Sequence, residues 1–403
     1  ISSSKEQAGH GSPFISFSTV FNNYFLPEEL PDLMDTSLKE QEIFSVKKDD
    51  VFITRTSETV DALAMSCVAV KDYPKATFSG FVKRLRPKTT GIVYSKYIAF
   101  FLRSKYFRKV LDCNTIMTLR ASFNEDMFSF LYLYLPDYEE QVRIGDLLYK
   151  MEMKIRTNNK INDNLEQQAK LLYDYWFTQF DFPDENGEPY RSSGGKMVWN
   201  EQLKRTIPDG WTTNPLSDIF TFKSGYSFSS DLYEVSGKYK LLTIKNVQNN
   251  GINLNVDNYI NVLPDNVPDY CLLKAQDILM SLTGNVGRVG IMYADNCLLN
   301  QRVALAEPVN INQRVFVYFL LKSDIIHKQY EMIANGSSQQ NLSPIEAEKV
   351  IIAYNPEVAT KFSTLCNEYL NTIVSNLAEN QELINIRDWL LPILMNGQAT
   401  ISD

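Results

Sequence analysis

The strongest constraint on the fold of this chain is an internal repeat. Four pairs of segments match in the same order in both halves, at a nearly constant separation: Ser18–Asn23 with Lys245–Asn250, Asp50–Thr56 with Asp277–Thr283, Phe100–Ser104 with Phe319–Ser323, and Leu131–Pro136 with Ile351–Pro356. Collinear matches whose separation drifts slowly indicate a duplication with small changes in loop length. The length of 403 residues fits two or three domains.

The order of predicted elements repeats as well. In each half a short strand is followed by an amphipathic helical stretch, then by a strand-like run that ends in proline, then by a long helix. The predicted strands and helical stretches are Asp50–Thr54 and Asp277–Ser281, then Tyr97–Leu111 and Val315–Tyr330. Each half is therefore one α+β domain followed by a long helix.

The two copies differ at their start. The second half opens with Ile207–Trp211 and Ile219–Phe228, and the first half has no counterpart to either segment. If the separation between Asp50 and Asp277 is carried back to the start of the chain, Ile1 corresponds to Phe228. We therefore expect the first domain to lack its opening strand and turn.

A heptad pattern marks both long helices. Apolar and asparagine residues alternate at spacings of three and four, which is typical of a helix that packs along a partner of similar length. In the first helix the seam comprises Leu148, Met151, Ile155, Asn158, Asn162, Leu165, Ala169, Leu172 and Trp176. In the second it comprises Cys366, Tyr369, Ile373, Asn376, Asn380, Leu383 and Leu390, with Arg387 standing where the first helix has Ala169.

The asparagines occupy equivalent places in the two helices. A buried asparagine in such a seam weakens packing but specifies register and partner. The alternative is a generic helical hairpin with solvated asparagines. The seam predicts two antiparallel coiled-coil helices, a pseudo-twofold repeat, and domains at opposite ends of a spacer. The predicted segments are 1–137 for the first domain, 138–180 for the central helix, 181–210 for a linker, 211–356 for the second domain and 357–395 for the distal helix.

Composition narrows the class of protein. The five cysteines are scattered without a C-x-x-C pair, which favours a reducing cytoplasm over a disulfide framework. No apolar run is long enough to cross a bilayer. The net charge of −8 alone argues against a nucleic-acid binder, but clustering of Lys and Arg matters more than their balance.

Catalytic patterns are missing from the sequence. The two histidines, His10 and His327, are far apart, which disfavours a histidine-based metal site or a catalytic triad. Gly284–Gly290 lacks the spacing of a nucleotide-binding loop and is interpreted as a turn between two strands. These absences disfavour a stand-alone methyltransferase or nuclease.

Basic and amide residues gather in loops. Arg contacts guanine, Asn and Gln contact adenine, and Lys and Arg contact phosphate, so such clusters favour DNA binding. Each residue taken alone is equally consistent with solvated surface. The candidate DNA-binding residues are Arg55, Thr56, Lys83, Arg84, Arg86, Arg103, Lys105, Arg120, Ser122, Asn285, Arg288, Gln301, Arg302, Lys322, Gln339, Gln340 and Asn341.

The whole pattern resembles the specificity subunit of Type I restriction-modification systems. The residues that carry the resemblance are Leu171–Pro183, similar to the end of the family's central helix, Pro189–Val198 and Ile207–Trp211, similar to the entry into its second domain, and Asn376–Leu391, similar to its distal helix. The resemblance implies two tandem target-recognition domains, each of which reads half of a split DNA target.

The resemblance also implies partners. The helices would set the unread spacer and dock two modification subunits, which would bring S-adenosylmethionine, while restriction subunits would translocate and cleave DNA. This chain would be a non-catalytic subunit with no cofactor or metal of its own. The competing interpretation is a helical scaffold or adaptor with two protein-binding domains and no DNA contact.

Overall fold

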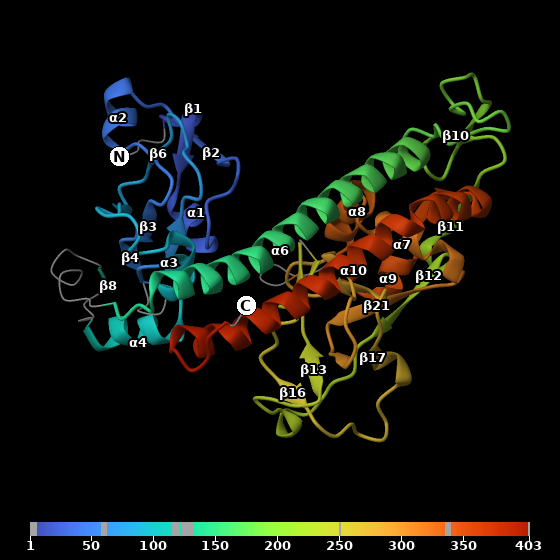
Figure 1. Cartoon of the computed structure of the whole chain (residues 1–403). Helices are drawn as coiled ribbons and strands as arrows, with labels where there is room; N and C mark the ends of the chain where they lie inside the picture. Colours follow the sequence, from blue (N-terminus) through green and yellow to red (C-terminus); the bar gives the residue numbers. More distant parts are fainter. Residues whose placement is uncertain are drawn as a thin grey trace. The chain divides into compact units, whose positions relative to one another are not determined.

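The computed structural model of the chain describes residues 6–57, 63–114, 121–122, 133–249, 251–334 and 340–401. The chain forms two compact units, Ile1–Ile155 with Glu382–Asp403, and Arg156–Gln381. Two long helices, α6 (Tyr138–Tyr173) and α10 (Pro356–Met395), contribute residues to both units (Figure 1).

The described residues of the first unit form two small three-stranded sheets and a two-stranded ladder. The sheet β2-β1-β6 consists of Asp32–Met34, Ala8–Ile15 and Thr77–Phe78; β5-β3-β7 consists of Ser66–Val68, Val51–Thr54 and Val82–Leu85; and β4-β8 consists of Thr56–Ser57 and Ala121–Ser122. Its short helices are α1 (Phe17–Asn22), α2 (Leu38–Ile43), α3 (Ser95–Phe101) and α4 (Lys105–Asn114).

In the second unit, the part of the chain that the structure describes forms two four-stranded sheets. The sheet β12-β21-β18-β19 consists of Phe220–Ser224, Val303–Pro308, Ile278–Ser281 and Val289–Ile291, and β16-β13-β20-β17 consists of Tyr259–Ile260, Tyr239–Leu242, Cys297–Leu299 and Leu272–Leu273. Three two-stranded ladders are β9-β10 (Met197–Asn200, Arg205–Pro208), β11-β22 (Thr212–Pro215, Ile351–Tyr354) and β14-β15 (Val247–Gln248, Gly251–Ile252). Besides its parts of α6 and α10, the described residues of this unit form the α-helices α7 (Arg314–Leu321), α8 (Asp324–Ile333) and α9 (Pro344–Glu348).

The strand pairings confirm the duplication. In the first unit Phe14 of β1 pairs with Thr77 of the parallel strand β6. In the second unit Leu241 of β13 pairs with Leu298 of the parallel strand β20. The repeat relates Phe14 to Leu241. Strand β7 pairs with β3 as β21 pairs with β18, which relates Leu85 to Ala306 and, at the same separation, Thr77 to Leu298. The two sheets therefore share one register.

The helical stretches predicted from the pattern are each split in two. The break between α3 and α4 falls at Ser104, and that between α7 and α8 falls at Ser323. The Ser104 hydroxyl accepts a hydrogen bond from the Phe107 amide, and the Ser323 hydroxyl accepts one from the Ile326 amide. A serine side chain that satisfies free amides at a helix start explains why both copies break at the same place.

Two matched segments have different local structures in the two units. Residues 18–23 form most of helix α1, whereas residues 245–249 form a turn and strand β14. The strand predicted before Pro356 is β22, but residues 133–136 form no strand. Strand β22 is held by its antiparallel partner β11, and the described part of the first unit contains no equivalent of β11. A strand without a partner has no ladder to stabilise it.

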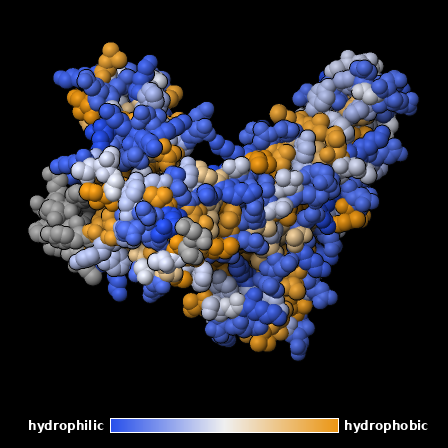
Figure 2. All heavy atoms as spheres, in the orientation of Figure 1, coloured by the Kyte–Doolittle hydropathy of each residue, from blue (hydrophilic) through white to orange (hydrophobic). Residues whose placement is uncertain are grey.

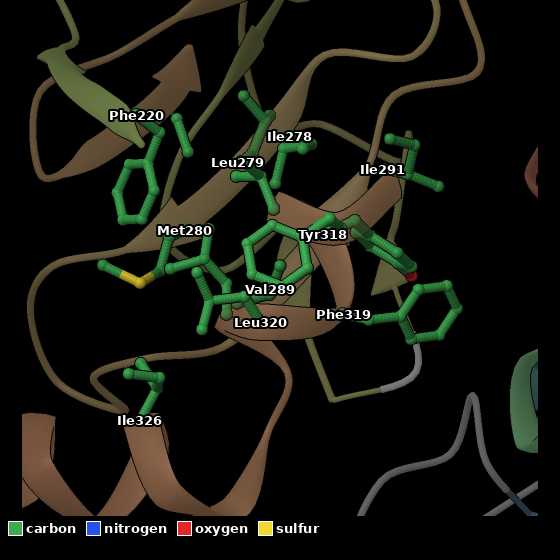
Figure 3. Close-up of a cluster of buried hydrophobic side chains, with 14 of the residues drawn as sticks. Phe220, Ile278, Leu279, Met280, Val289, Ile291, Tyr318, Phe319, Leu320 and Ile326 are labelled. Carbon is green, nitrogen blue, oxygen red and sulfur yellow. The ribbon is translucent and has the colours of Figure 1, made fainter. Parts of the chain in front are cut away.

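The cores show why both long helices belong to each unit. In the first unit Ile144 and Leu148 of α6 pack in one buried cluster with Leu391 and Leu394 of α10. In the second unit α6 and α10 join the larger cluster, part of which appears in Figure 3. There Ile278 and Met280 of β18 lie against helices α7 and α8, with Phe220 of β12 in the same cluster.

Helices α6 and α10 pack antiparallel, as the heptad pattern predicted. Asn162 bonds to Asn376, and Asn158, one turn earlier, bonds to Asn380, one turn later. The seam side chains are buried or half-buried, and Arg387 is among them because its guanidinium pairs with Glu152 at 3.2 Å. The position that breaks the apolar seam is therefore filled by an ion pair.

The surface of the chain has a mixed hydropathy. On the face shown in Figure 2, hydrophilic residues alternate with several separate hydrophobic patches. Among the described residues, no helix combines the length and apolar character needed to cross a bilayer.

Candidate nucleic-acid interface

Three loop segments of the second unit meet at the end of strand β18. The Leu282 amide donates to the Arg302 carbonyl at 2.9 Å, and the Leu342 amide donates to the Leu282 carbonyl at 2.8 Å. The Gly284 amide donates to the Gln340 carbonyl at 2.9 Å. These backbone bonds bring together three parts of the chain that are well separated in the sequence.

The β18–β19 hairpin presents an asparagine and an arginine next to each other. With its amide oriented to satisfy both groups, the Asn285 oxygen accepts from Nη2 of Arg288 at 2.9 Å. The Ser281 hydroxyl donates to the Asn285 carbonyl and accepts from the Arg288 amide. The two side chains are thus preorganised by a buried serine at the base of the hairpin.

The other two segments add polar side chains around this hairpin. Asn341 accepts a bond from the Thr283 hydroxyl at 3.2 Å and is itself exposed, as is Gln340. Gln301 and Arg302 are exposed in the turn before β21, where Arg302 adopts a φ of 71°. The structure therefore gathers six of the eight candidates of the second unit at one place.

The hairpin turn depends on glycine. Gly287 has a φ of +78°, a conformation that strains any residue with a Cβ atom. A Cβ there would lie 3.1 Å from Nδ1 of His327, so the turn packs directly against helix α8. Glycine at this position lets the hairpin approach the helix closely.

The first unit repeats the same three-way junction. Thr56 of β4 pairs with Ser122 of β8, which is the equivalent of the bridge between Thr283 and Asn341. The Arg55 amide donates to the Phe81 carbonyl at 2.8 Å, as the Leu282 amide does to the Arg302 carbonyl. The Arg55 side chain is exposed. Arg120 and Gln339 lie outside the described residues.

Other basic candidates of the first unit are held within it. Arg86 makes two bonds of 2.6 Å to the fully buried carboxylate of Asp50, which raises the pKa of Arg86, and Arg84 donates to the Ser45 carbonyl. Lys83 lies on β7 beside Arg84, half-buried, and Lys105 is exposed at the start of α4. Of this group, Lys105 has its side chain in solvent.

Arg103 is an internal residue. Its guanidinium donates to the carbonyls of Ser66, Val20, Phe21 and Asn23, at 2.7 to 2.9 Å, and stacks on the ring of Tyr24. Burial lowers the pKa of Arg103. These contacts give the Arg103 side chain a role within the fold rather than at an interface with DNA.

Lys322 is held in the same way in the second unit. It pairs with Glu166 of α6, and both it and Tyr318 of α7 bond to that carboxylate. Burial raises the pKa of Tyr318 to about 12. This cluster connects α7 to α6, so Lys322 also has a role within the fold rather than at an interface with DNA.

Sequence reasoning missed two residues of these junctions. Ser281 ends a strand-like run and gives no sign that its hydroxyl organises the hairpin. Phe81, at 61% exposure, occupies the place of Arg302 in the first unit. Extending the repeat through the segment between its second and third matches would have paired Phe81 with Arg302. No group of three or more His, Cys, Asp or Glu suited to a metal occurs among the described residues.

The fold and the junctions define a protein with two similar polar loop surfaces, each built on an α+β domain, and an antiparallel pair of helices. Residues 1–167 and 208–354 match the family described as Type I restriction modification DNA specificity domain. The chain therefore belongs to the family of Type I restriction-modification specificity subunits. Its role is non-catalytic, and it supplies DNA sequence specificity to a restriction-modification complex.

Individual relatives agree with this assignment. The Type I restriction enzyme MjaIX specificity subunit of Methanocaldococcus jannaschii is 25% identical over 83% of this chain and 76% of its own. The HindI specificity subunit of Haemophilus influenzae is 25% identical over 96% of this chain and 94% of its own. The crystal structure of a Type I S subunit from M. genitalium shares the fold, with a TM-score of 0.57, 17% identity and coverage of 97% and 91%.

Proposed function

We propose that each unit reads one half of a bipartite double-stranded DNA target with its three-way loop junction. In the second unit this surface comprises residues 282–288, 300–302 and 340–341. In the first it comprises Arg55, Thr56 and Phe81, with Lys105 as a further cation. The observation that carries the proposal is that both units keep one backbone arrangement and change the side chains displayed on it.

The differences between the two surfaces suit two different half-sites. Arg55 stands where the second unit has Leu282, and Phe81 stands where it has Arg302. Arginine makes bidentate contacts with guanine, and asparagine or glutamine with adenine. The second surface therefore offers contacts to both purines through Arg288, Arg302 and Gln340, while the described part of the first offers the cations Arg55 and Lys105.

We further propose that the helices set the unread spacer and dock two modification subunits. The hydrogen-bonded asparagines specify one register for α6 against α10, which a ruler of constant length requires. S-adenosylmethionine belongs to the modification subunits and ATP-driven translocation to restriction subunits, and this chain takes no cofactor. A cytoplasmic location follows from these partners.

The test is selection from a random duplex library by the chain assembled with its modification subunits. Wild type should enrich two half-sites at a constant spacing, with affinity that falls steeply as salt rises. Arg288→Ala and Arg302→Ala should each relax one half-site by about 1–3 kcal/mol, roughly 5- to 150-fold, and leave the other half unchanged.

Lys196→Ala is the matched control, because Lys196 is an exposed cation of the same unit outside the junction. It should change neither half-site. An adaptor without DNA contact would show no enriched sequence and a flat salt response, which would refute the proposal. Relaxation of both half-sites by Arg302→Ala would contradict the assignment of one half to each unit.

A further inference from the structure

One turn of the first unit displays a phenylalanine where the second unit displays an arginine. Phe81 lies in the turn between β6 and β7, and Arg302 lies in the equivalent turn between β20 and β21. The side chain of Phe81 is 61% exposed, so most of its apolar surface faces solvent. A single exposed apolar residue is ordinary, but Phe81 stands within a surface whose other members are polar.

The two turns are closed by the same backbone hydrogen bond. The Val82 amide donates to the Ser79 carbonyl at 3.0 Å, and the Val303 amide donates to the Asn300 carbonyl at 3.3 Å. The repeat relates these two pairs of residues to each other. The duplication has therefore kept the turn and changed the side chain that it carries.

A buried polar side chain fixes each turn further. The Ser79 hydroxyl, 6% exposed, accepts from the Phe81 amide at 3.2 Å, and the side-chain oxygen of Asn300 accepts from the Gln301 amide at 2.8 Å. The Phe81 carbonyl accepts from the Arg55 amide at 2.8 Å. Because Phe81 is held at both its amide and its carbonyl, its ring is carried by a fixed backbone.

A phenylalanine ring on a surface that meets DNA has few suitable contacts. All four bases present hydrogen-bond donors or acceptors in the major groove, and thymine adds an apolar methyl group. A phenylalanine side chain makes no use of the donors and acceptors, whereas apolar contact with the thymine methyl group suits it. The neighbouring Arg55 is exposed and suits guanine.

The second unit indicates which groove the turn enters. An exposed phenylalanine can also act as a wedge between base steps in the minor groove. The equivalent surface carries Arg288, Arg302 and Gln340, side chains that distinguish bases by their major-groove edges. Two copies of one loop arrangement should enter the same groove, which favours contact with a methyl group over a wedge.

We propose that Phe81 selects a thymine in the half-site of the first unit through the C5 methyl group of that base. This inference rests on the proposed reading of DNA by the junctions and adds the base that one side chain selects. Arg302, at the equivalent position, suits guanine instead. The two half-sites therefore differ at the base pair that this turn meets.

The test uses the chain assembled with its modification subunits and the duplex that it selects. The half-site of the first unit is the one that Arg55→Ala relaxes. Each thymine of that half-site is replaced singly by deoxyuridine, which keeps the base pair and removes only the methyl group. At one position the wild-type complex should bind about fourfold more weakly, the loss expected for one buried methyl group.

Phe81→Ala should bind the thymine and deoxyuridine duplexes equally at that position. The substitution should leave the melting midpoint unchanged, because Phe81 is exposed. Leu38→Ala is the matched control, since Leu38 is an 82% exposed apolar residue of α2, outside this surface. It should keep the full loss on removal of the methyl group. The deoxyuridine series on the wild-type chain decides even if Phe81→Ala does not fold.

Three results would overturn the proposal: a half-site without thymine in either strand, equal binding of every deoxyuridine duplex, or a deoxyuridine loss that persists in Phe81→Ala. A Phe81→Ala complex that binds all duplexes more weakly, with or without their methyl groups, would identify a wedge instead. Each of these results leaves DNA reading by the first unit in place. Failure of the proposed function differs, because Arg55→Ala would then relax neither half-site, and both proposals would fall.

Discussion

Asn158 of α6 donates a hydrogen bond of 2.9 Å to the Oδ1 atom of Asn380 in α10, and both side chains are buried. A second bond, from Asn376 to Asn162, has a length of 2.8 Å. The repeat relates Asn158 to Asn376 and Asn162 to Asn380, so each bond is the copy of the other. Sliding one helix by a turn would leave two of the four asparagines without an asparagine partner in the seam, which disfavours any other register.

Breaking one of these bonds should destabilise the chain. Asn158→Leu leaves the Asn380 oxygen without its buried donor, and the expected loss is about 1–3 kcal/mol in the free energy of unfolding. The double variant with Asn380→Leu should recover most of this loss, because leucine pairs pack well in a seam. Urea unfolding of the single and double variants measures both effects. Additive losses in the double variant would contradict the pairing.

The ion pair between Arg387 and Glu152 should matter more than a surface pair. Their side chains are 14% and 13% exposed, and the guanidinium also lies over the ring of Tyr24. Removal of one charge by Arg387→Leu should cost roughly 3 kcal/mol, since the remaining carboxylate stays desolvated. Exchanging the two charges in one variant should restore part of the stability. An unchanged melting midpoint for Arg387→Leu would contradict this prediction, because it would show that the Glu152 carboxylate becomes hydrated once the guanidinium is removed.

Two arginines from similar basic stretches should differ in what their replacement by alanine impairs, stability in one case and DNA binding in the other. Arg103→Ala removes four bonds to backbone carbonyls and should lower stability by about 2–3 kcal/mol. Arg302→Ala, at an exposed turn, should leave the melting midpoint within a degree or two and weaken DNA binding. Thermal unfolding and duplex titration on both variants separate the two roles. A stable Arg103→Ala chain with weakened DNA affinity would reverse the assignment.

Equivalent aspartates should respond differently to loss of charge. Asp50 and Asp277 each accept a bond from the backbone amide three residues earlier, but Asp50 also binds Arg86. Asp50→Asn should destabilise the chain by about 1.5–3 kcal/mol through loss of charge-assisted bonds. Desolvation raises the pKa of Asp277, so its ionised form opposes folding.

The sign of the pH effect follows from that raised pKa. The folded chain holds a proton on Asp277 more tightly than the unfolded chain, so this group makes stability fall as the pH rises through the raised pKa. Asp277→Asn should therefore be more stable than wild type at pH 7. The difference should narrow as the pH falls towards the ordinary carboxyl value near 4. A difference that is constant from pH 7 down to pH 4, or that grows on acidification, would contradict this.

Local residue patterns were sufficient to predict the duplication, one interior strand of a sheet in each unit (β3 and β18) and the antiparallel helix pair. These features depend on periodicity and on matches along the chain, and Asn158, Asn162, Asn376 and Asn380 stand in the seam as a pattern of threes and fours requires. The resemblance to Type I specificity subunits rested on the same helical segments, and the family match confirmed it.

Tertiary structure decided which polar side chains are available to a partner. Arg302 and Arg103 are the same residue type in similar basic stretches, yet one lies in an exposed turn and the other donates to carbonyls brought together from separate segments. Lys322 and Arg86 are likewise held by carboxylates distant in the sequence, the half-buried Glu166 and the fully buried Asp50. A local pattern records residue type and spacing, whereas hydrogen-bond partners are selected only when the chain folds.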